Sequence, residues 1–407
     1  MSIRVRRWRS PAGEMKSAWV VDYFDQHRKR HIKTFARKRD AEACHAQVAV
    51  DVRAGIHSAD SGSISVAQAG ELWLQNRVAA GLEPTTLVTY RIYVNRHITP
   101  RIGATRLSQL TVPAARAFED RLRVKCSSGV TRAVMRTLGA ILADAQERGL
   151  VAQNVVRSLR RHRGHGSEHR HDKRHKGKLK IGVDIPSPDE VRAIVAALAD
   201  LPRWRPVLLT AIFTGLRASE LRGLRWADVD LKRGEIHVRQ RADALNKIGR
   251  PKSAAGERAV PLPPMLVRAL QEWKLACPHS ELGLAFPTER GKVQTRKKIA
   301  ALGLGVAQLA AGVTAPMLDS HGRPTRDKKG KSIVAAKYPG LHSLRHFYAS
   351  WCINRRVDGG LELPPKIVQE RLGHATITLT MDTYGHLFPR GDDGAELAAA
   401  EKAFLAG

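Results

Sequence analysis

The sequence predicts a multidomain protein with a small β-sheet and helix at its amino end, an all-helical domain next, and a mixed α/β, mainly helical, domain at its carboxyl end. Three observations support this organisation. Residues 1–62 contain short β-prone runs, residues 63–160 repeat apolar side chains at helical spacing, and residues 185–407 combine both patterns. At 407 residues the chain is long enough for each part to bury its own core.

The amino-terminal part, residues 1–62, opens with the runs IRVRRWRSP, SAWVVDYFD and KRHIKTFA. The turn-rich stretches SPAGE and DQHRK separate them, so we expect a small antiparallel sheet. One helix should follow in KRDAEACHAQVAVDVRAG, because its apolar residues recur at helical spacing until Gly55.

Residues 63–160 read as helices joined by short turns. SVAQAGELWLQNRVAAG follows a serine cap, and PTTLVTYRIYVNRHITPRIG continues the helical pattern until a proline and a glycine stop it. TVPAARAFEDRLRV and VTRAVMRTLGAILADAQERG complete the predicted bundle.

Arginines are the candidate DNA contacts of these two parts. A basic sheet can read DNA, but it can also be a solvated surface that binds nothing specific. Likewise, a charge stripe on a helix is usually a solvated face, although this one has few acids between its cations. The candidates are Arg4, Arg6 and Arg7 in the sheet and Arg91, Arg96, Arg101, Arg132 and Arg136 in the helices.

Residues 161–184 form a basic, histidine-rich linker in this prediction. Such a composition cannot bury a core, so we expect it to be mobile or to lie along phosphates. Its histidines match no closed zinc site, so no metal site is expected.

The last part, residues 185–407, begins with SPDEV, where Ser187 and Glu190 form a capping signature. WRPVLLTAIFTG and RASELRGLRWADV predict helices, and EIHVRQRA and ERAVPLP predict two strands joined by DALNKIGRPKSAAG. The disordered-looking insert at 319–332 has no assignable role, and the tail GDDGAELAAAEKAFLAG predicts a short amphipathic helix.

The formal charge of +31 indicates a polyanionic partner, of which nucleic acid is the obvious one. The chain has no uncharged apolar run of about 18 residues, as a membrane span requires. The opening MSIRVRRWRSPAGEMK is not a secretory signal, so we expect a cytoplasmic, nucleoid-associated protein. The four scattered cysteines predict reduced, mostly buried thiols.

Four short motifs in the last part carry groups suited to attack on a phosphodiester. TGLRASEL places Arg217 and Glu220 about one helical turn apart, although alone this is an ordinary ion pair. HSLRH places His342 and Arg345 on one helix face, and we expect His346 to be structural, one position off that face.

LGH supplies His374, and Tyr384 follows ten residues later. Lys252 lies in KSAAGER, a loop flexible enough to reach into a site. A phenol with a pKa of about 10 is a poor nucleophile at neutral pH unless a base and nearby cations help it. The arginines, lysine and histidines could supply that help.

Taken together, these motifs resemble the active-site series of the tyrosine recombinases, the phage-integrase family. The matching residues, in chain order, are Arg217, Lys252, His342, Arg345, His374 and Tyr384. The flanking residues match as well, in GLRW, ERAVPL, GLHSLRH and LGHATITLTMDTYGH. The resemblance implies a catalytic domain of the tyrosine recombinase type at 185–407, a core-site-binding domain before it, and an arm-type DNA-binding module at the amino end.

The resemblance also implies residue roles. Tyr384 would attack the scissile phosphate and become a 3′-phosphotyrosine, while Arg217 and Arg345 would hold the non-bridging oxygens. The transition state builds charge on those oxygens, and stabilising such charge is usually the largest catalytic effect.

Four further roles follow from the same resemblance. Lys252 would protonate the leaving 5′-oxygen, His342 would act in acid/base transfer at the tyrosine, His374 would donate to the phosphate, and Glu220 would orient its neighbours. No cofactor is implied, because a covalent phosphotyrosine keeps the bond energy needed for rejoining.

The implied function is site-specific recombination that integrates or excises a phage or other mobile element. The implied partners are double-stranded attachment sites, a homotetramer on DNA, and DNA-bending or excision proteins, with no membrane. Two alternatives stay open: a type IB topoisomerase, and a DNA-binding regulator whose catalytic site has decayed.

Overall fold

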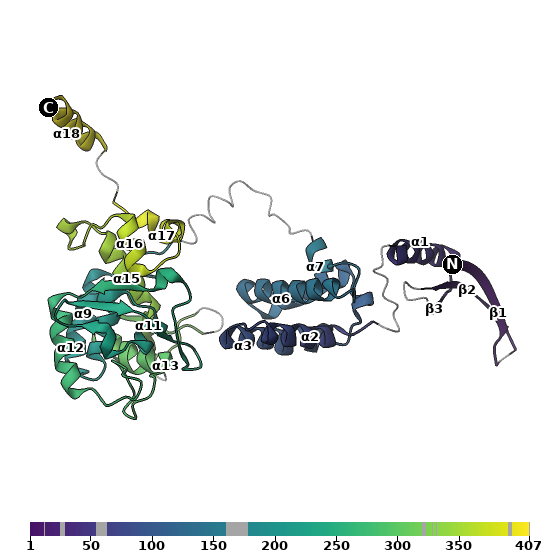
Figure 1. The fold of residues 1–407 in the computed structure, drawn as a ribbon, viewed down its shortest axis with the longest axis horizontal. Coiled ribbons are helices and arrows are strands. Elements are labelled where there is room, and N and C mark those ends of the chain that lie inside the picture. The colour runs from purple at the N-terminus through teal and green to yellow at the C-terminus, as the bar shows by residue number, and fades with distance from the viewer. Residues whose placement is uncertain are drawn as a thin grey trace. The chain divides into compact units, whose positions relative to one another are not determined.

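The computed structural model divides the chain into two compact units, Met1–Gly164 and His165–Gly407, which are described separately (Figure 1). The residues that it describes are 1–11, 13–24, 29–53, 63–159, 178–319, 323–327, 329–330, 332–389 and 393–406.

The first unit begins with the predicted sheet. Its strands are β1 (Ser2–Arg9), β2 (Met15–Phe24) and β3 (Arg30–Phe35), paired antiparallel in the order β1-β2-β3. Helix α1 (Lys38–Arg53) packs on one face through a core that includes Val21, Tyr23, Ala41 and Val48. The predicted three strands and single helix are therefore confirmed.

The register of β1 separates the candidate arginines of the sheet. Arg4 pairs with Val20 and Arg6 with Ala18, so both side chains lie on one face, and Arg7 lies on the other because strand side chains alternate. Arg4 also contacts a carboxylate, with its Nη2 3.3 Å from Oδ2 of Asp22.

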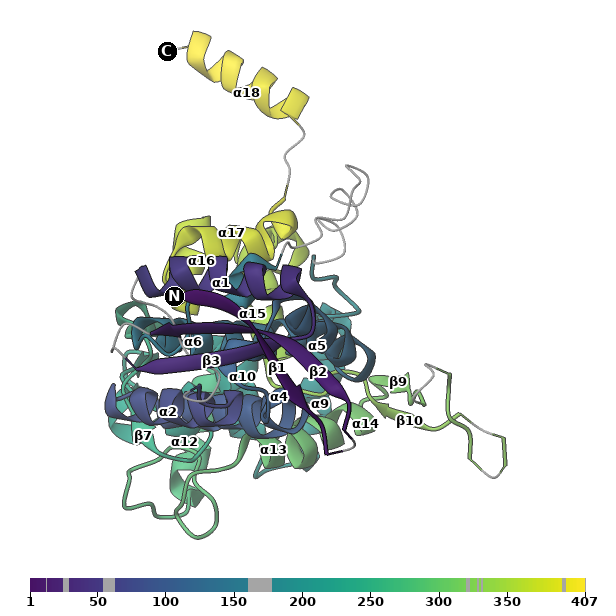
Figure 2. The same cartoon turned by 90° about the vertical axis from the view of Figure 1, so that its right-hand side faces the viewer.

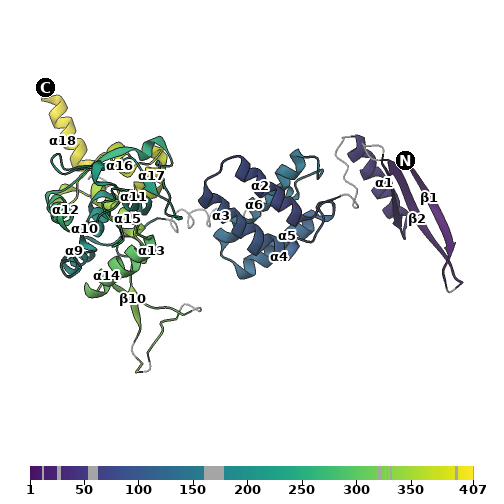
Figure 3. The same cartoon turned by 60° about the horizontal axis from the view of Figure 1, so that its bottom comes forward.

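The rest of the first unit is helical, as predicted, and Figure 3 shows its helices. Ser65 caps the first helix in a reciprocal capping box with Gln68. The second predicted helix is interrupted by a π-helical turn, and Arg101 donates to the Arg96 and His97 carbonyls there, at 3.0 and 3.1 Å. The elements are α2 (Val66–Ala79), α3 (Pro84–Ile92), η1 (Tyr93–Ile98), α4 (Thr99–Ile102), η2 (Leu107–Gln109), α5 (Val112–Lys125), α6 (Ser128–Glu147) and α7 (Val155–Ser158).

The second unit mixes helices with short strands. Its helices are α9 (Pro188–Ala197), η3 (Leu198–Asp200), α10 (Arg205–Thr214), α11 (Ala218–Gly223), η4 (Trp226–Asp228), η5 (Ala254–Gly256), α12 (Pro264–Ala276), α13 (Arg296–Lys298), η6 (Ile299–Gly305), α14 (Val306–Ala310), α15 (His342–Ile353), η7 (Arg356–Asp358), α16 (Pro365–Leu372), α17 (Ile377–Tyr384), η8 (Gly385–Leu387) and α18 (Asp393–Leu405). Its strands are β4 (Val229–Asp230), β5 (Glu235–Val238), β6 (Arg241–Ala242), β7 (Ile248–Gly249), β8 (Arg258–Pro261), β9 (Thr314–Pro316) and β10 (Val334–Ala336).

Several local predictions for this unit are confirmed. Ser187 and Glu190 form the capping box of α9, the two predicted strands pair as β5 and β8, and the tail forms α18. The loop between β5 and β8 also contains a hairpin, β6–β7, that the sequence did not predict. The described part of the 319–332 insert extends outward beyond the ends of strands β9 and β10 (Figure 2).

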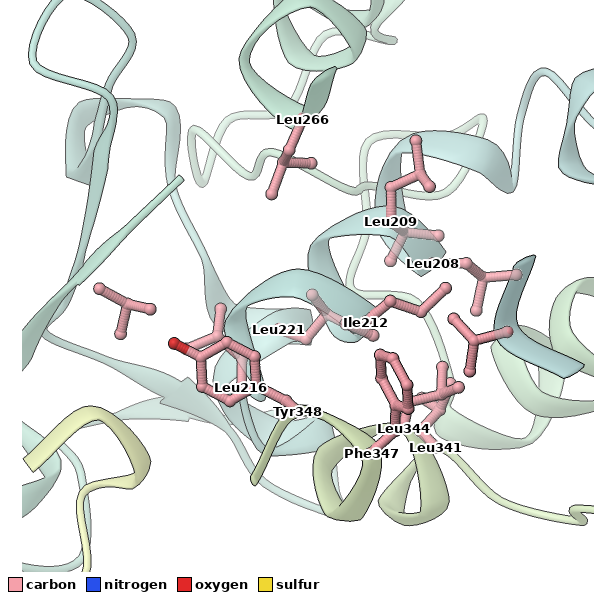
Figure 4. Packing of buried hydrophobic residues seen from close by; sticks show 14 of the residues in the cluster. Leu208, Leu209, Ile212, Leu216, Leu221, Leu266, Leu341, Leu344, Phe347 and Tyr348 are labelled. Atoms are coloured by element: carbon pink, nitrogen blue, oxygen red, sulfur yellow. The ribbon is translucent and has the colours of Figure 1, made fainter. Parts of the chain in front are cut away.

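The core of the second unit surrounds α10, which is apolar on almost all sides and therefore buried. Leu208, Leu209 and Ile212 of α10 belong to the same buried cluster as Leu344 and Phe347 of α15 (Figure 4). This packing fixes the positions of two candidate catalytic arginines, Arg217 shortly after the end of α10 and Arg345 within α15.

Most of the predicted linker, residues 161–177, lies outside the described residues. Leu179, near its end, has its carbonyl oxygen 2.8 Å from Nε2 of His386. In the described part of the chain, no helix is long and apolar enough to cross a membrane.

All four cysteines are free thiols, as predicted, but most are not fully buried. Only Cys352 is buried, and Cys44, Cys126 and Cys277 are half-buried. The prediction of mostly buried thiols is therefore wrong, and Cys44 and Cys126 lie at the edges of their cores.

Candidate active site

Arg217 begins the site directly after the buried helix α10. Its Nη1 donates to Oε1 of Glu220 at 2.7 Å, its Nη2 donates to the Gly373 carbonyl at 2.8 Å, and its backbone N–H donates to Oε2 of Glu220 at 2.9 Å. The side chain is still 37% exposed, whereas that of Glu220 is 4% exposed. The carboxylate therefore holds an arginine whose remaining donors are open to a ligand.

Arg258 of β8 is a second partner of Glu220 that sequence reasoning missed. Its Nη2 lies 2.9 Å from Oε2 of Glu220, and its Nε donates to the Arg371 carbonyl at 2.7 Å. Burial opposes ionisation of Glu220, but Arg258 and Arg217 hold its pKa below the ordinary value. The sequence could have predicted that Arg258 points inward, because side chains alternate along a strand and Arg258 lies on the same face of β8 as the buried Val260.

Arg345 lies on α15 with only 2% of its surface exposed. Its Nη1 donates to the Gly215 carbonyl and its Nη2 to the Leu372 carbonyl, both at 2.6 Å. Burial, with the nearby charge of Arg217, lowers the pKa of Arg345 to about 9. The two carbonyls come from the end of α10 and the end of α16, so the guanidinium position depends on three helices.

His374 follows a helix end that only glycine suits. Gly373 caps α16 with φ +64°, and a Cβ there would lie 2.8 Å from both the Ala255 carbonyl oxygen and Nη1 of Arg258. His374 is 8% exposed, and its Nδ1 lies 2.9 Å from Oγ1 of Thr380. Burial, with Arg345 and other cations, lowers its pKa to about 4, so the ring is neutral near pH 7.

Tyr384 ends α17 and is 1% exposed. Its ring lies parallel to that of His374, with centroids 6.3 Å apart. Burial raises the pKa of Tyr384 to about 12, although Arg345 and Arg217 pull it down. The phenol is therefore almost wholly protonated at neutral pH, so its reaction requires a proton acceptor.

His346 is the nearest such acceptor, and the prediction that it lies off the catalytic face is wrong. Its Nδ1 lies 2.8 Å from the Tyr384 oxygen. Residues at i and i+4 share a helix face, so His346 lies beside His342, with ring centroids 4.4 Å apart. The four-residue spacing between the two histidines of HSLRH could have predicted that they share a helix face.

His342 is exposed, and it lines a cleft of about 970 Å³ together with Arg217. Arg222, Arg296 and Lys297 also line this cleft, so its wall is basic. Although His342 is exposed to the cleft, partial desolvation of its ring and the charges of Arg345 and Arg217 lower its pKa.

Lys252 is exposed in the loop between β7 and β8. Among the described residues, no hydrogen bond or ion pair joins it to the other candidates. The structure therefore brings together Arg217, Glu220, Arg345, His374 and Tyr384 with the added Arg258 and His346, and it leaves Lys252 outside this cluster.

The cluster suits phosphoryl transfer. Two guanidinium groups match the oxygens of a phosphate, and neutral imidazoles can accept or donate protons. In the part of the chain that the structure describes, no group of three or more His, Cys, Asp or Glu side chains could hold a metal ion.

Comparisons with known proteins agree with this fold. The family model described as "Phage integrase family" matches residues 187–390, half of the chain, so the chain belongs to the phage integrase family of tyrosine recombinases. It is 24% identical over 371 residues to a XerC-like tyrosine recombinase of Caldanaerobacter subterraneus, covering 87% of each protein.

Two solved structures share the fold at low sequence identity. The Tn1549 transposon integrase, solved with a circular intermediate DNA, has 16% identity and a TM-score of 0.59, and the match covers 84% of this chain and 100% of that one. The lambda integrase tetramer bound to a Holliday junction has 17% identity and a TM-score of 0.54, with 91% and 96% covered.

Proposed function

We propose that this chain is a site-specific recombinase that cuts and rejoins double-stranded DNA through a 3′-phosphotyrosine at Tyr384. The observation that carries the proposal is the position of that phenol, which shares one buried cluster with Arg345 and His374 and lies in the field of Arg217. Membership of the phage integrase family supports the same reaction class.

In this proposal, Arg217 and Arg345 bind the non-bridging oxygens of the scissile phosphate. Each has guanidinium donors beyond those that hold it in place, and the charge that develops in the transition state strengthens these contacts. If the Thr380 hydroxyl donates to Nδ1 of His374, the ring keeps its proton on Nε2 and can donate to the phosphate.

Lys252 is proposed to protonate the leaving 5′-oxygen. Since it lies on an exposed loop outside the cluster, this role requires the loop to move towards the phosphate when DNA binds. His342 at the cleft is proposed to take part in proton transfer near the tyrosine.

The proposed substrates are the attachment sites of a phage or other mobile element, bound by a homotetramer with DNA-bending or excision proteins as helpers. The similar proteins support this proposal, since one is the integrase of a transposon, bound to a circular intermediate DNA, and another is an integrase tetramer bound to a Holliday junction. The net charge of +31 suits binding along DNA. The proposed contacts are Arg4, Arg6, Arg7, Arg91, Arg96, Arg132 and Arg136.

The test uses the full chain in EDTA without nucleotide, on nicked duplexes of a site obtained by selecting bound sequences from random DNA. A protein–DNA adduct on a denaturing gel from the natural protein, and none from Tyr384→Phe, is the expected result. Tight binding with no adduct on any selected site would favour the decayed regulator. Relaxation of supercoiled DNA that needs no defined site, by a monomer, would favour the topoisomerase.

A further inference from the structure

We propose that His346 is the residue that exchanges the proton with Tyr384, taking it during cleavage and returning it during rejoining. This inference rests on the proposed function and changes one part of it, because the family resemblance implies His342 for this step. The chemistry at the phosphate is unaffected.

The geometry favours His346 over His342. The Nδ1 atom of His346 lies 2.8 Å from the Tyr384 oxygen, within hydrogen-bond distance, and the two rings meet at 61° with centroids 5.7 Å apart. No contact between His342 and the Tyr384 oxygen is present in the described part of the chain. The ring of His342 instead packs edge-on against the ring of His346.

The helix that carries His346 is held firmly. Leu344 and Phe347 lie on either side of it in the chain and belong to the core around α10. Tyr384 lies at the end of α17, whose Thr380 is tied to His374. The hydrogen bond therefore joins two positioned elements, so little ordering is needed before reaction.

The surroundings of His346 keep its ring unprotonated at neutral pH, so that its Nδ1 can act as an acceptor. Burial, with the charges of His342 and Arg345, lowers its pKa to about 4, and the charge of Asp184 acts in the opposite direction. Near pH 7 the ring is neutral, and the phenol that faces it has a pKa of about 12. Fewer than about one phenol in 10⁴ would be ionised at that pH without a base.

The proton balance closes in both directions. In cleavage, the Tyr384 oxygen forms a bond to phosphorus, its proton moves to Nδ1 of His346, and the bond to the 5′-oxygen breaks as that oxygen takes a proton from Lys252. In rejoining, the 5′-hydroxyl attacks phosphorus and gives its proton back to Lys252. The phosphorus–tyrosine bond breaks, and His346 returns its proton to the phenolate. No other reactant is required.

The test compares His346→Asn, His342→Asn and Lys252→Ala on two suicide substrates, one with the natural 5′-oxygen and one with a bridging 5′-sulfur. A sulfur leaving group departs without a proton. The sulfur substrate therefore restores the cleavage rate of a variant that lacks the acid for the leaving group, but not that of a variant that lacks the base for the nucleophile. We expect Lys252→Ala to recover on sulfur, and His346→Asn to stay slower by about 10²–10³-fold on both substrates.

A second arm changes the nucleophile itself. A fluorinated tyrosine at position 384 has a lower pKa and needs less help from a base. It should restore most of the adduct formation of His346→Asn while leaving Lys252→Ala slow on the oxygen substrate. A merely structural role of His346 would not respond to the acidity of the phenol, so this arm separates catalysis from folding.

Two results would overturn the inference. In the first, His346→Asn cleaves DNA as fast as the natural protein. In the second, it is His342→Asn that cleaves slowly on both the oxygen and the sulfur substrate and recovers when position 384 carries fluorotyrosine. Circular dichroism and DNA binding check that each variant is folded. Failure of the proposed function itself looks different, since the natural protein would then give no adduct.

Discussion

The Nη2 atom of Arg258 donates to Oε2 of Glu220 over 2.9 Å, and these side chains are only 6% and 4% exposed. A buried ion pair repays its desolvation only when its remaining donors are satisfied. Here they are, because Arg258 also donates to the carbonyls of Gly256 and Arg371. The pair thereby connects β8 and the end of α16 to Arg217, which shares the same carboxylate.

Replacing Arg258 with methionine should be costly. The change leaves a buried carboxylate with one partner in place of two, so the free energy of unfolding should fall by about 3 kcal/mol. Adduct formation should fall as well, since Arg217 loses its support. Urea unfolding and the adduct assay measure these effects. Arg192→Met, at an exposed surface pair, is the matched control and should change stability by less than about 0.5 kcal/mol.

Gly373→Ala should destabilise the second unit through both conformation and space. The left-handed conformation costs an alanine about 1 kcal/mol, and the close approach to the Ala255 carbonyl and Arg258 adds to it. Gly359→Ala is the control, because its φ is +79° but a Cβ there meets nothing within 4 Å. Equal losses of unfolding free energy in the two variants would show that the close approach does not matter.

Stability should fall as the pH drops from about 6.5 to about 4. The folded state lowers the pKa of His374 to about 4, so over this range the unfolded chain binds more protons than the folded one. For His374 the loss between about pH 7.5 and pH 5 should be about 1–2 kcal/mol, and His374→Gln should remove that share. Urea unfolding at about pH 7.5 and about pH 5 measures this loss of unfolding free energy. An unchanged pH dependence in His374→Gln would contradict the assignment.

The helical domain can be tested through salt dependence. Arg132 and Arg136 lie one turn apart on α6 and are both exposed. If each contacts a phosphate, the double alanine variant should reduce the slope of log affinity against log salt by about 2. Arg123→Ala, at an exposed arginine paired with Glu119, should leave the slope unchanged. An unaltered slope in the double variant would remove these arginines from the interface.

Much of the local structure was readable from the sequence. The serine caps of α2 and α9, the three amino-terminal strands and the helix of HSLRH followed from capping residues and periodicity, which act over a few residues. The order of the motifs likewise identified the family. Hairpin β6–β7 and the π-helical turn at Tyr93–Ile98 were missed. The strands of the hairpin have only two residues each, too few to show a period-two pattern, and the π-helical turn lies within a continuous helical pattern of apolar residues.

The sequence by itself determined which residue types were available for the chemistry: two arginines, a lysine, two histidines and one tyrosine in a characteristic order. Tertiary structure decided which of them meet. It placed His346, not His342, against the Tyr384 oxygen, and it brought Arg258 to Glu220 across 38 positions of the chain. The physical reason is that hydrogen bonds and ion pairs depend on distances of a few ångströms, and those distances are set by the packing of helices around a shared core, not by spacing along the chain.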